Sequence, residues 1–144
     1  MEEKKRKNKL LIRKIIKIVF VLVLIFLIQH FYVRNKMVGD EITPLVTNYN
    51  NACPIMISDD IRMESVNSLP ENTVQYDFTL VRIIKESIDV NALKKSVEKE
   101  ILSTSKTNPS LEAFRSNSTT VVYVYRDNNQ KMLFKVVLTP EQYQ

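Results

Sequence analysis

The chain has 144 residues and a formal net charge of +5, but this charge is unevenly distributed. Residues 1–36 contain ten Lys or Arg and two Glu, a net +8, whereas residues 37–144 contain eleven Lys or Arg and fourteen Asp or Glu, a net −3. The C-terminal part therefore has no basic excess to offer to phosphates, which argues against nucleic-acid binding. The only glycine is Gly39, and this excludes a Gly-rich phosphate loop, a dinucleotide fingerprint and a nucleophile elbow.

The run IVFVLVLIFLI, residues 18–28, contains only apolar residues. With its flanks it predicts a helix over residues 15–33, which would be roughly 28 Å long and close to the ~30 Å hydrocarbon thickness of a bilayer. Eight basic residues precede the run and only two closely follow it: Lys4, Lys5, Arg6, Lys7, Lys9, Arg13, Lys14 and Lys17, then Arg34 and Lys36. The positive-inside rule therefore places residues 1–14 in the cytoplasm as a basic tail and the C-terminal part outside.

A cleavable signal peptide is the main alternative to an uncleaved signal anchor, because it too has a basic segment followed by a short apolar core. The residues after the core, 29–36, contain no small-x-small cleavage site, and this favours the anchor. We expect the protein in a membrane, with its C-terminal domain on the extracytoplasmic side. The helix and the basic tail would contact membrane lipids, the tail through anionic headgroups.

The segment after the predicted anchor, residues 34–53, is either a linker or a short helix with Pro44 in its first turn. Residues 54–144 then show the patterns of an α+β domain. Residues 61–66 and 74–81 alternate as strands around a turn at 68–72. Helix patterns follow, a longer one after Asp89 and a shorter one that begins at Asn108 and Pro109. Two further strands, residues 121–125 and 132–139, flank a turn at 127–129.

This order, β-β-α-α-β-β, predicts one antiparallel sheet with the helices packed across one face. The stretch 121–125 is apolar on both faces, as in a covered or central strand. The longer helix carries an apolar stripe of Val90, Leu93, Val97 and Ile101 and polar residues on its other side.

Few residues of the domain suggest catalytic or metal chemistry. The only histidine is His30, at the predicted membrane boundary, so the domain itself can form neither a His-based triad nor a His-rich zinc site. Asp59, Asp60 and Glu64 match no EF-hand loop and favour a solvated strand start over a Ca²⁺ site. Glu64 and Asp77 resemble a glycosidase pair only in residue type, since the chain has no Trp for sugar stacking. We expect no catalytic residue, no cofactor and no metal.

Three tyrosines on the predicted strands, Tyr76, Tyr123 and Tyr125, are the candidate interaction surface. Aromatic residues on a sheet face more often belong to the core or to cross-strand pairs, and both interpretations are open from the sequence. The single cysteine, Cys53, allows no intramolecular disulfide. It can be free, paired with another chain, or a small buried apolar group.

Four segments resemble a group of small bacterial membrane-anchored proteins or lipoproteins of unknown function: CPIMISDDIRMESV (53–66), YDFTLV (76–81), VYVYRD (122–127) and LTPEQY (138–143). The resemblance covers about residues 50–143, with Ile61 in place of an expected Thr. It implies an extracytoplasmic bacterial domain, so we expect the anchor in a bacterial cytoplasmic (inner) membrane and the C-terminal domain periplasmic or extracellular. The resemblance brings no catalytic residues with it.

These observations predict a single-pass, membrane-anchored accessory or interaction protein without enzymatic activity, whose partner is another envelope protein. An immunity or inhibitor protein against a toxin or hydrolase at the membrane would have the same sequence features. The third class is an enzyme that acts on envelope polymers through Asp and Glu. The sequence argues against it, because it offers no set of nucleophile, base and orienting group.

Overall fold

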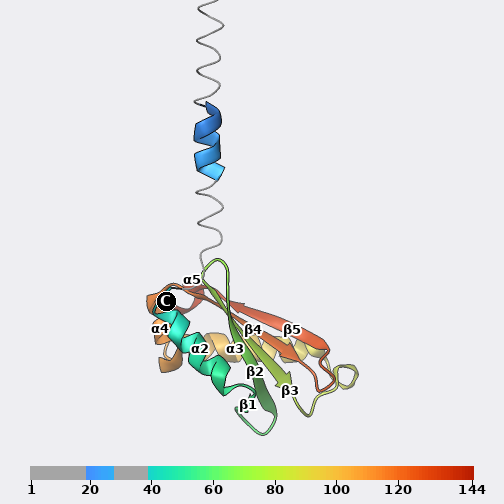
Figure 1. The fold of residues 1–144 in the computed structure, drawn as a ribbon. Helices are drawn as coiled ribbons and strands as arrows, with labels where there is room; N and C mark the ends of the chain where they lie inside the picture. Colours follow the sequence, from blue (N-terminus) through green and yellow to red (C-terminus); the bar gives the residue numbers. More distant parts are fainter. Residues whose placement is uncertain (1–18, 28–38) are drawn as a thin grey trace, which may run out of the picture. The chain divides into compact units, whose positions relative to one another are not determined.

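The computed structural model describes residues 19–27 and 39–144, in two separate units. Residues 19–27, inside the apolar run, are helical (Figure 1). The rest of the predicted span over 15–33, together with the basic tail and His30, lies outside the described residues. Among the helices of the described ranges, none is both long enough and apolar enough to cross a bilayer.

Residues 39–144 form a small α+β domain with a five-stranded mixed sheet in the order β1-β2-β3-β4-β5. Its strands are β1 (Ile55–Met56), β2 (Ile61–Leu69), β3 (Thr73–Leu80), β4 (Thr120–Arg126) and β5 (Met132–Leu138). Its helices are α2 (Ile42–Ala52), α3 (Val90–Ser105), α4 (Glu112–Ser116) and α5 (Pro140–Tyr143), with short 3₁₀ turns η1 (Lys85–Ser87) and η2 (Pro109–Leu111).

The predicted order of the central elements is confirmed, but the prediction of a purely antiparallel sheet is wrong. Strand β3 pairs with β4 in parallel, with Tyr76 opposite Tyr123, while the other neighbouring strands are antiparallel. The reason is the connection: α3, η2 and α4 bring the chain back to the end of the sheet where β3 began, so β4 must run in the same direction.

The helices cover one face of the sheet, as predicted. The core contains alternate residues of β3, β4 and β5 together with side chains from α2, η2, α4 and α5, namely Val74, Phe78, Val121, Tyr125, Phe134, Val136 and Leu138 with Ile42, Val46, Leu111, Phe114 and Tyr143. Helix α3 contacts β5 and lies behind the strands in Figure 1. The intervening strand residues, among them Gln75, Asp77 and Lys135, point to the opposite face and lie outside this core.

The sequence allowed either a linker or a short helix within residues 34–53, and the structure shows a helix there. Helix α2 buries Ile42 and Val46 in the core, and the Asn50 side chain accepts a hydrogen bond from the backbone N–H of Val66 on β2 (3.2 Å). The helix therefore covers part of the outer edge of β2 where the two-residue β1 does not reach. The other edge strand, β5, carries the exposed Lys135, a residue type that discourages strand addition.

Asn72 joins the β2–β3 turn to the α4–β4 junction. Its φ is 51°, a left-handed conformation that Asn tolerates better than most residues. Its Nδ2 donates to the backbone oxygens of Asn117 (2.8 Å) and Ser118 (3.0 Å), and its Oδ1 accepts from Thr119 Oγ1 (3.3 Å). This side chain therefore ties together two segments some 45 residues apart.

We expect Asn72→Ala to lower the free energy of unfolding by about 2–4 kcal/mol, because three side-chain hydrogen bonds and the tolerated left-handed conformation are lost together. Urea unfolding of the full-length protein in mild detergent measures this change. Asn72→Asp keeps the acceptor oxygen and loses the donor, so it should cost an intermediate amount. A loss below about 0.5 kcal/mol for Asn72→Ala would show that the junction does not depend on this side chain.

Candidate functional site

A row of stacked aromatic rings crosses the helix-covered face of the sheet. Tyr76 on β3 stacks on Tyr123 on β4, with ring centroids 5.7 Å apart and planes 22° from parallel. The row continues from Phe78 to Tyr125 (5.3 Å) and from Tyr125 to Phe134 on β5 (4.9 Å). The parallel register of β3 and β4 produces the row, because it places Tyr76 opposite Tyr123 and Phe78 opposite Tyr125.

Two helices add rings at the β3 end of this row. Phe114 of α4 meets Tyr76 edge-on, with centroids 6.4 Å apart and planes at 89°. Tyr49 of α2 is tilted against the same ring at 6.2 Å. Offset and edge-on arrangements of this kind are the favourable geometries for aromatic pairs. Tyr76 is thus fixed in place from three sides.

The three tyrosines predicted as an interaction surface differ in exposure. Tyr125 lies in the core and is 9% exposed, whereas Tyr76 and Tyr123 are only half-buried. Within residues 39–144, every fully buried side-chain polar atom has a hydrogen-bond partner, and no hydrogen bond to the hydroxyl of Tyr76 or Tyr123 is found there. The side chains of Tyr76 and Tyr123 are therefore partly accessible to solvent.

The tyrosine hydroxyls lie in poorly hydrated surroundings. Burial raises the pKa of Tyr76, and the nearby hydroxyls of Tyr49 and Tyr123 raise it further. Burial likewise raises the pKa of Tyr123, with added contributions from Tyr125 and Tyr143. Burial raises the pKa of Tyr125 to about 12. At neutral pH these groups are protonated, so they can both donate and accept hydrogen bonds.

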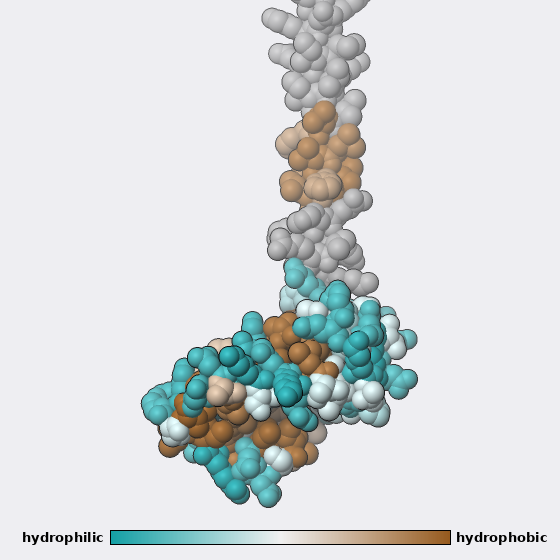
Figure 2. All heavy atoms as spheres, turned by 180° about the vertical axis from the view of Figure 1, so that it is seen from behind, coloured by the Kyte–Doolittle hydropathy of each residue, from teal (hydrophilic) through white to brown (hydrophobic). Residues whose placement is uncertain are grey.

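We call the half-buried residues Tyr49, Tyr76 and Tyr123 the tyrosine surface. Other residues that pack against the core are also only half-buried: Leu45, Cys53, Ile61, Ile83, Ile88, Val90, Leu93, Val97 and Ile101. Figure 2, which views the domain from the side on which α3 lies, shows hydrophobic residues in two places, with hydrophilic residues between them.

The acidic residues considered for metal or glycosidase chemistry do not converge. Asp60 forms an ion pair with Arg82 (3.0 Å), and Glu64 with Arg62 (2.8 Å). Asp77 accepts hydrogen bonds from Ser65 (3.1 Å) and Gln75 (3.0 Å). Asp59 is exposed, and residues 19–27 and 39–144 contain no cluster of His, Cys, Asp and Glu that could hold a metal ion.

Cys53 is a free, half-buried thiol at the C-terminal end of α2. Its Sγ donates to the backbone oxygen of Tyr49 (3.1 Å). Burial raises its pKa, and the nearby carboxylate of Glu64 raises it further. The thiol is therefore protonated at neutral pH and is a poor nucleophile.

Comparison with known proteins places this domain in a family. A family model described as Domain of unknown function (DUF8479) matches residues 40–134. The chain belongs to this family. The match covers the DUF8479 domain from the turn before α2 into β5 and therefore includes the whole tyrosine surface. No curated protein matches the chain in sequence.

Two solved structures share the fold of the DUF8479 domain. A protein of Pseudomonas aeruginosa described as secreted is 10% identical, with a TM-score of 0.57, and the alignment covers 69% of this chain and 87% of that one. The type II secretion system pilotin AspS of Vibrio cholerae is 8% identical, with a TM-score of 0.50, and the alignment covers 69% and 85% of the two chains. At these identities the likeness shows a common fold.

Proposed function

We propose that this protein is a membrane-anchored, extracytoplasmic accessory protein without enzymatic activity, and that its DUF8479 domain binds another envelope protein. The observation that carries the proposal is the tyrosine surface. Its three tyrosines are only half-buried, so each offers part of an aromatic ring and a hydroxyl group at the edge of the core. Tyrosine is enriched at protein interfaces because it offers a large apolar ring and a polar tip.

The anchor in this proposal is the helix over residues 15–33, in a bacterial cytoplasmic membrane. Its support is the apolar run 18–28 and the eight basic residues before it, which orient residues 1–14 toward the cytoplasm. The helical residues 19–27 fall inside this run. The domain would then be periplasmic or extracellular, and the basic tail would lie against anionic lipid headgroups.

The fold comparison supports the class of role. One solved protein with this fold is named a type II secretion system pilotin and another is described as secreted, so the fold occurs in proteins of the bacterial envelope and exterior. We carry over from the pilotin only the idea of an accessory that works with another envelope protein. In this chain we assign the contact to Tyr76 and Tyr123, with Tyr125 as the buried ring that supports them.

Site-specific photo-crosslinking in native membranes tests the proposal. A photoreactive residue replaces Tyr76, Tyr123 or, as the control on the opposite face of the sheet, the exposed Lys135. We expect one protein to be crosslinked from both tyrosine positions and not from Lys135. The double variant Tyr76→Ala/Tyr123→Ala, still sedimenting with membranes, should lose about tenfold or more of this partner, because central interface aromatics carry much of the binding energy.

Equal crosslinking from all three positions, or an unchanged partner in the double variant, would place any interaction elsewhere on the domain. Release of the wild-type protein from membranes by an alkaline wash would contradict the anchor. The two parts of the proposal thus fail separately.

A further inference from the structure

The two edges of the sheet differ in how well they are protected. Strand β5 forms one edge, and β1, which has only two residues, forms the other (Figure 1). An edge strand presents backbone N–H and C=O groups that can pair with a strand of another chain, and native proteins ordinarily block such pairing. An edge that lacks this protection is a candidate interaction surface.

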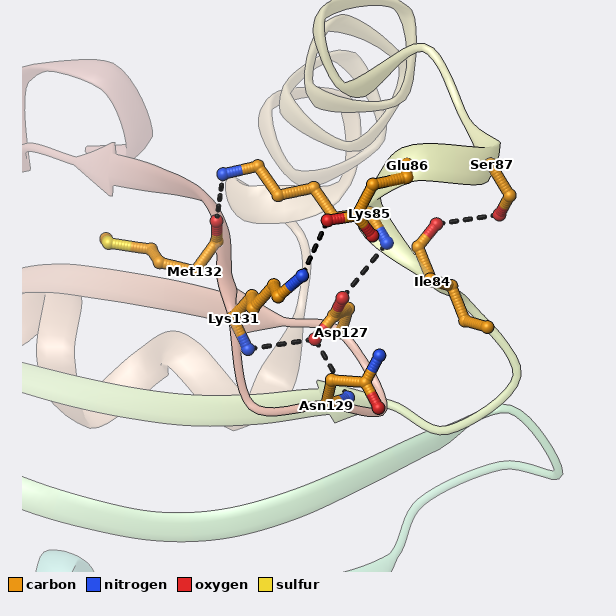
Figure 3. A network of polar contacts seen from close by, with 8 residues as sticks. All are labelled: Ile84, Lys85, Glu86, Ser87, Asp127, Asn129, Lys131 and Met132. Atoms are coloured by element: carbon orange, nitrogen blue, oxygen red, sulfur yellow. Dashed lines mark hydrogen bonds and ion pairs between the residues drawn. The ribbon is translucent and has the colours of Figure 1, made fainter.

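The β5 edge is protected at both ends and at its centre. At its first residue, Nζ of Lys85 donates to the backbone oxygen of Met132 (2.9 Å), as Figure 3 shows. Just beyond its last residue, the backbone N–H of Thr139 donates to Oε1 of Gln142 (2.8 Å). Between them lies the exposed Lys135. Two copies of β5 paired over their full length would place Lys135 opposite Lys135, and like charges directly opposite each other are destabilising.

The β1 edge carries only apolar side chains. Ile55 and Met56, which form the strand, are 42% and 48% exposed, and the following Ile57 is 53% exposed. Every residue from 54 to 60 is exposed, so no other part of the domain covers this edge. Exposed apolar residues on a sheet edge favour pairing with another chain.

The backbone of β1 offers Met56 for such pairing. Met56 lies opposite Arg62 of β2, and the N–H of the next residue, Ile57, donates to the backbone oxygen of Ile61 (3.0 Å). In an antiparallel ladder, hydrogen-bonded and non-hydrogen-bonded pairs alternate. The N–H and C=O of Met56 therefore point away from β2. Outside the ladder, residues 39–144 contain no backbone partner for these two groups.

A second copy of this chain fits the β1 edge. When two β1 strands run antiparallel about a two-fold axis at Met56, the two Met56 residues exchange both of their backbone hydrogen bonds. In the same register, Ile55 of each copy lies opposite Ile57 of the other. All these cross-strand pairs are apolar, and such pairs stabilise a sheet.

The charged residues near the axis allow the same pairing. In this register Asp59 of each copy lies opposite the uncharged thiol of Cys53 of the other. Asp60 forms its ion pair with Arg82 of its own chain (3.0 Å). The β1 edge therefore brings no like charges together, in contrast to the Lys135 pair at the β5 edge.

We propose that two copies of this protein associate through β1, so that their five-stranded sheets join into one sheet across a two-fold axis at Met56. Three side chains from each copy make a contact smaller than the roughly 1,200–2,000 Å² of stable interfaces, so the association is weak and depends on concentration. The pairing uses no residue of the tyrosine surface. It therefore goes beyond the proposed function, and each can fail without the other.

Disulfide crosslinking of the full-length protein in mild detergent tests the pairing. In a Cys53→Ser background, Met56→Cys or the matched control Leu102→Cys provides the only cysteine. Leu102 is exposed to a similar extent (42%) and belongs to α3, which contacts β5. With a mild copper oxidant, we expect the linked dimer to form about tenfold or more faster from Met56→Cys, because the Cα atoms of a hydrogen-bonded pair lie about 5.5 Å apart, within disulfide range. Alkylation rates of the two thiols correct for any difference in their reactivity.

Mixed variants test the register. Ile55→Cys and Ile57→Cys, in the same background, should link faster when mixed than when either is alone, because the two-fold pairing places each opposite the other. Adding Met56→Lys to both should suppress this linking, since it places like charges opposite each other at the axis. Adding Leu102→Lys, which introduces the same charge on α3, should leave it unchanged.

Two results would overturn the proposal. One is an equal rate of linking from Met56→Cys and Leu102→Cys in the purified protein. The other is a Met56→Cys variant that, oxidised in native membranes, becomes linked to a different protein and not to a second copy of itself.

Discussion

Tyr143→Ala is expected to lower the free energy of unfolding by about 3–5 kcal/mol, the cost of removing a fully buried aromatic ring. The Tyr143 side chain on α5 has no exposed surface, and its hydroxyl donates to the backbone oxygen of Thr119, which is equally buried. Small domains are stable by only about 5–15 kcal/mol, so this one change removes a large part of the total. Urea unfolding of the full-length protein, followed by circular dichroism, measures the loss.

Two variants separate the contributions to this effect. Tyr143→Phe keeps the ring and leaves the Thr119 oxygen without its donor, so it should cost about 1–2 kcal/mol. Tyr49→Ala removes the same side chain from the half-buried position on α2 and should cost less than Tyr143→Ala. If Tyr143→Ala and Tyr49→Ala were equal, α5 would not be part of the cooperative core.

The strands and the long helix could be predicted because their signals are local. Alternation marks β3 and β5, and the stripe from Val90 to Ile101 with Asp89 before it marks α3, whose cap the structure shows accepting from the N–H groups of Asn91 and Ala92. Helix α5 was not predicted, because four residues at the chain end are too short for a periodic pattern. Its sequence signal was Thr139 followed by Pro140, an N-cap and a first-turn proline.

The strand pairing could not be predicted in the same way. Whether β3 and β4 run parallel depends on the end of the sheet to which the helices return the chain. The residues of the two strands do not indicate which end that is. This same pairing sets the aromatic row. Alternation alone puts Tyr123 and Tyr125 on one face of β4, but only the register with β3 brings Tyr76 beside Tyr123.

The polar residues that join distant segments also escaped the sequence analysis. Asn72 contacts a junction 45 residues later, and Asp127 contacts the backbone of Lys85, 42 residues earlier. Each contact joins elements that meet only in the folded chain, so the spacing of residues along the sequence does not reveal it. The one available signal was residue type, since Asn and Asp in tight turns often bond to nearby backbone groups.

This domain should unfold at a less alkaline pH than its composition suggests. Burial raises the pKa of Tyr125 and of Tyr143 to about 12, the latter despite the opposing charge of Arg115, and raises those of Tyr76 and Tyr123 as well. In the unfolded chain each tyrosine has a pKa of about 10. The unfolded state therefore releases protons first as the pH rises above about 10, and stability falls across the interval up to the folded pKa.

For Tyr125 and Tyr143 this effect amounts to roughly 2–3 kcal/mol each by about pH 12, enough together to remove much of the stability of a small domain. Thermal unfolding of the full-length protein at a series of pH values, with tyrosinate absorbance recorded in parallel, tests it. Tyr125→Phe and Tyr143→Phe should each flatten the decline, because phenylalanine releases no proton. The expectation fails if all six tyrosines ionise reversibly near pH 10 while the fold persists, since their hydroxyls would then be hydrated in the folded domain.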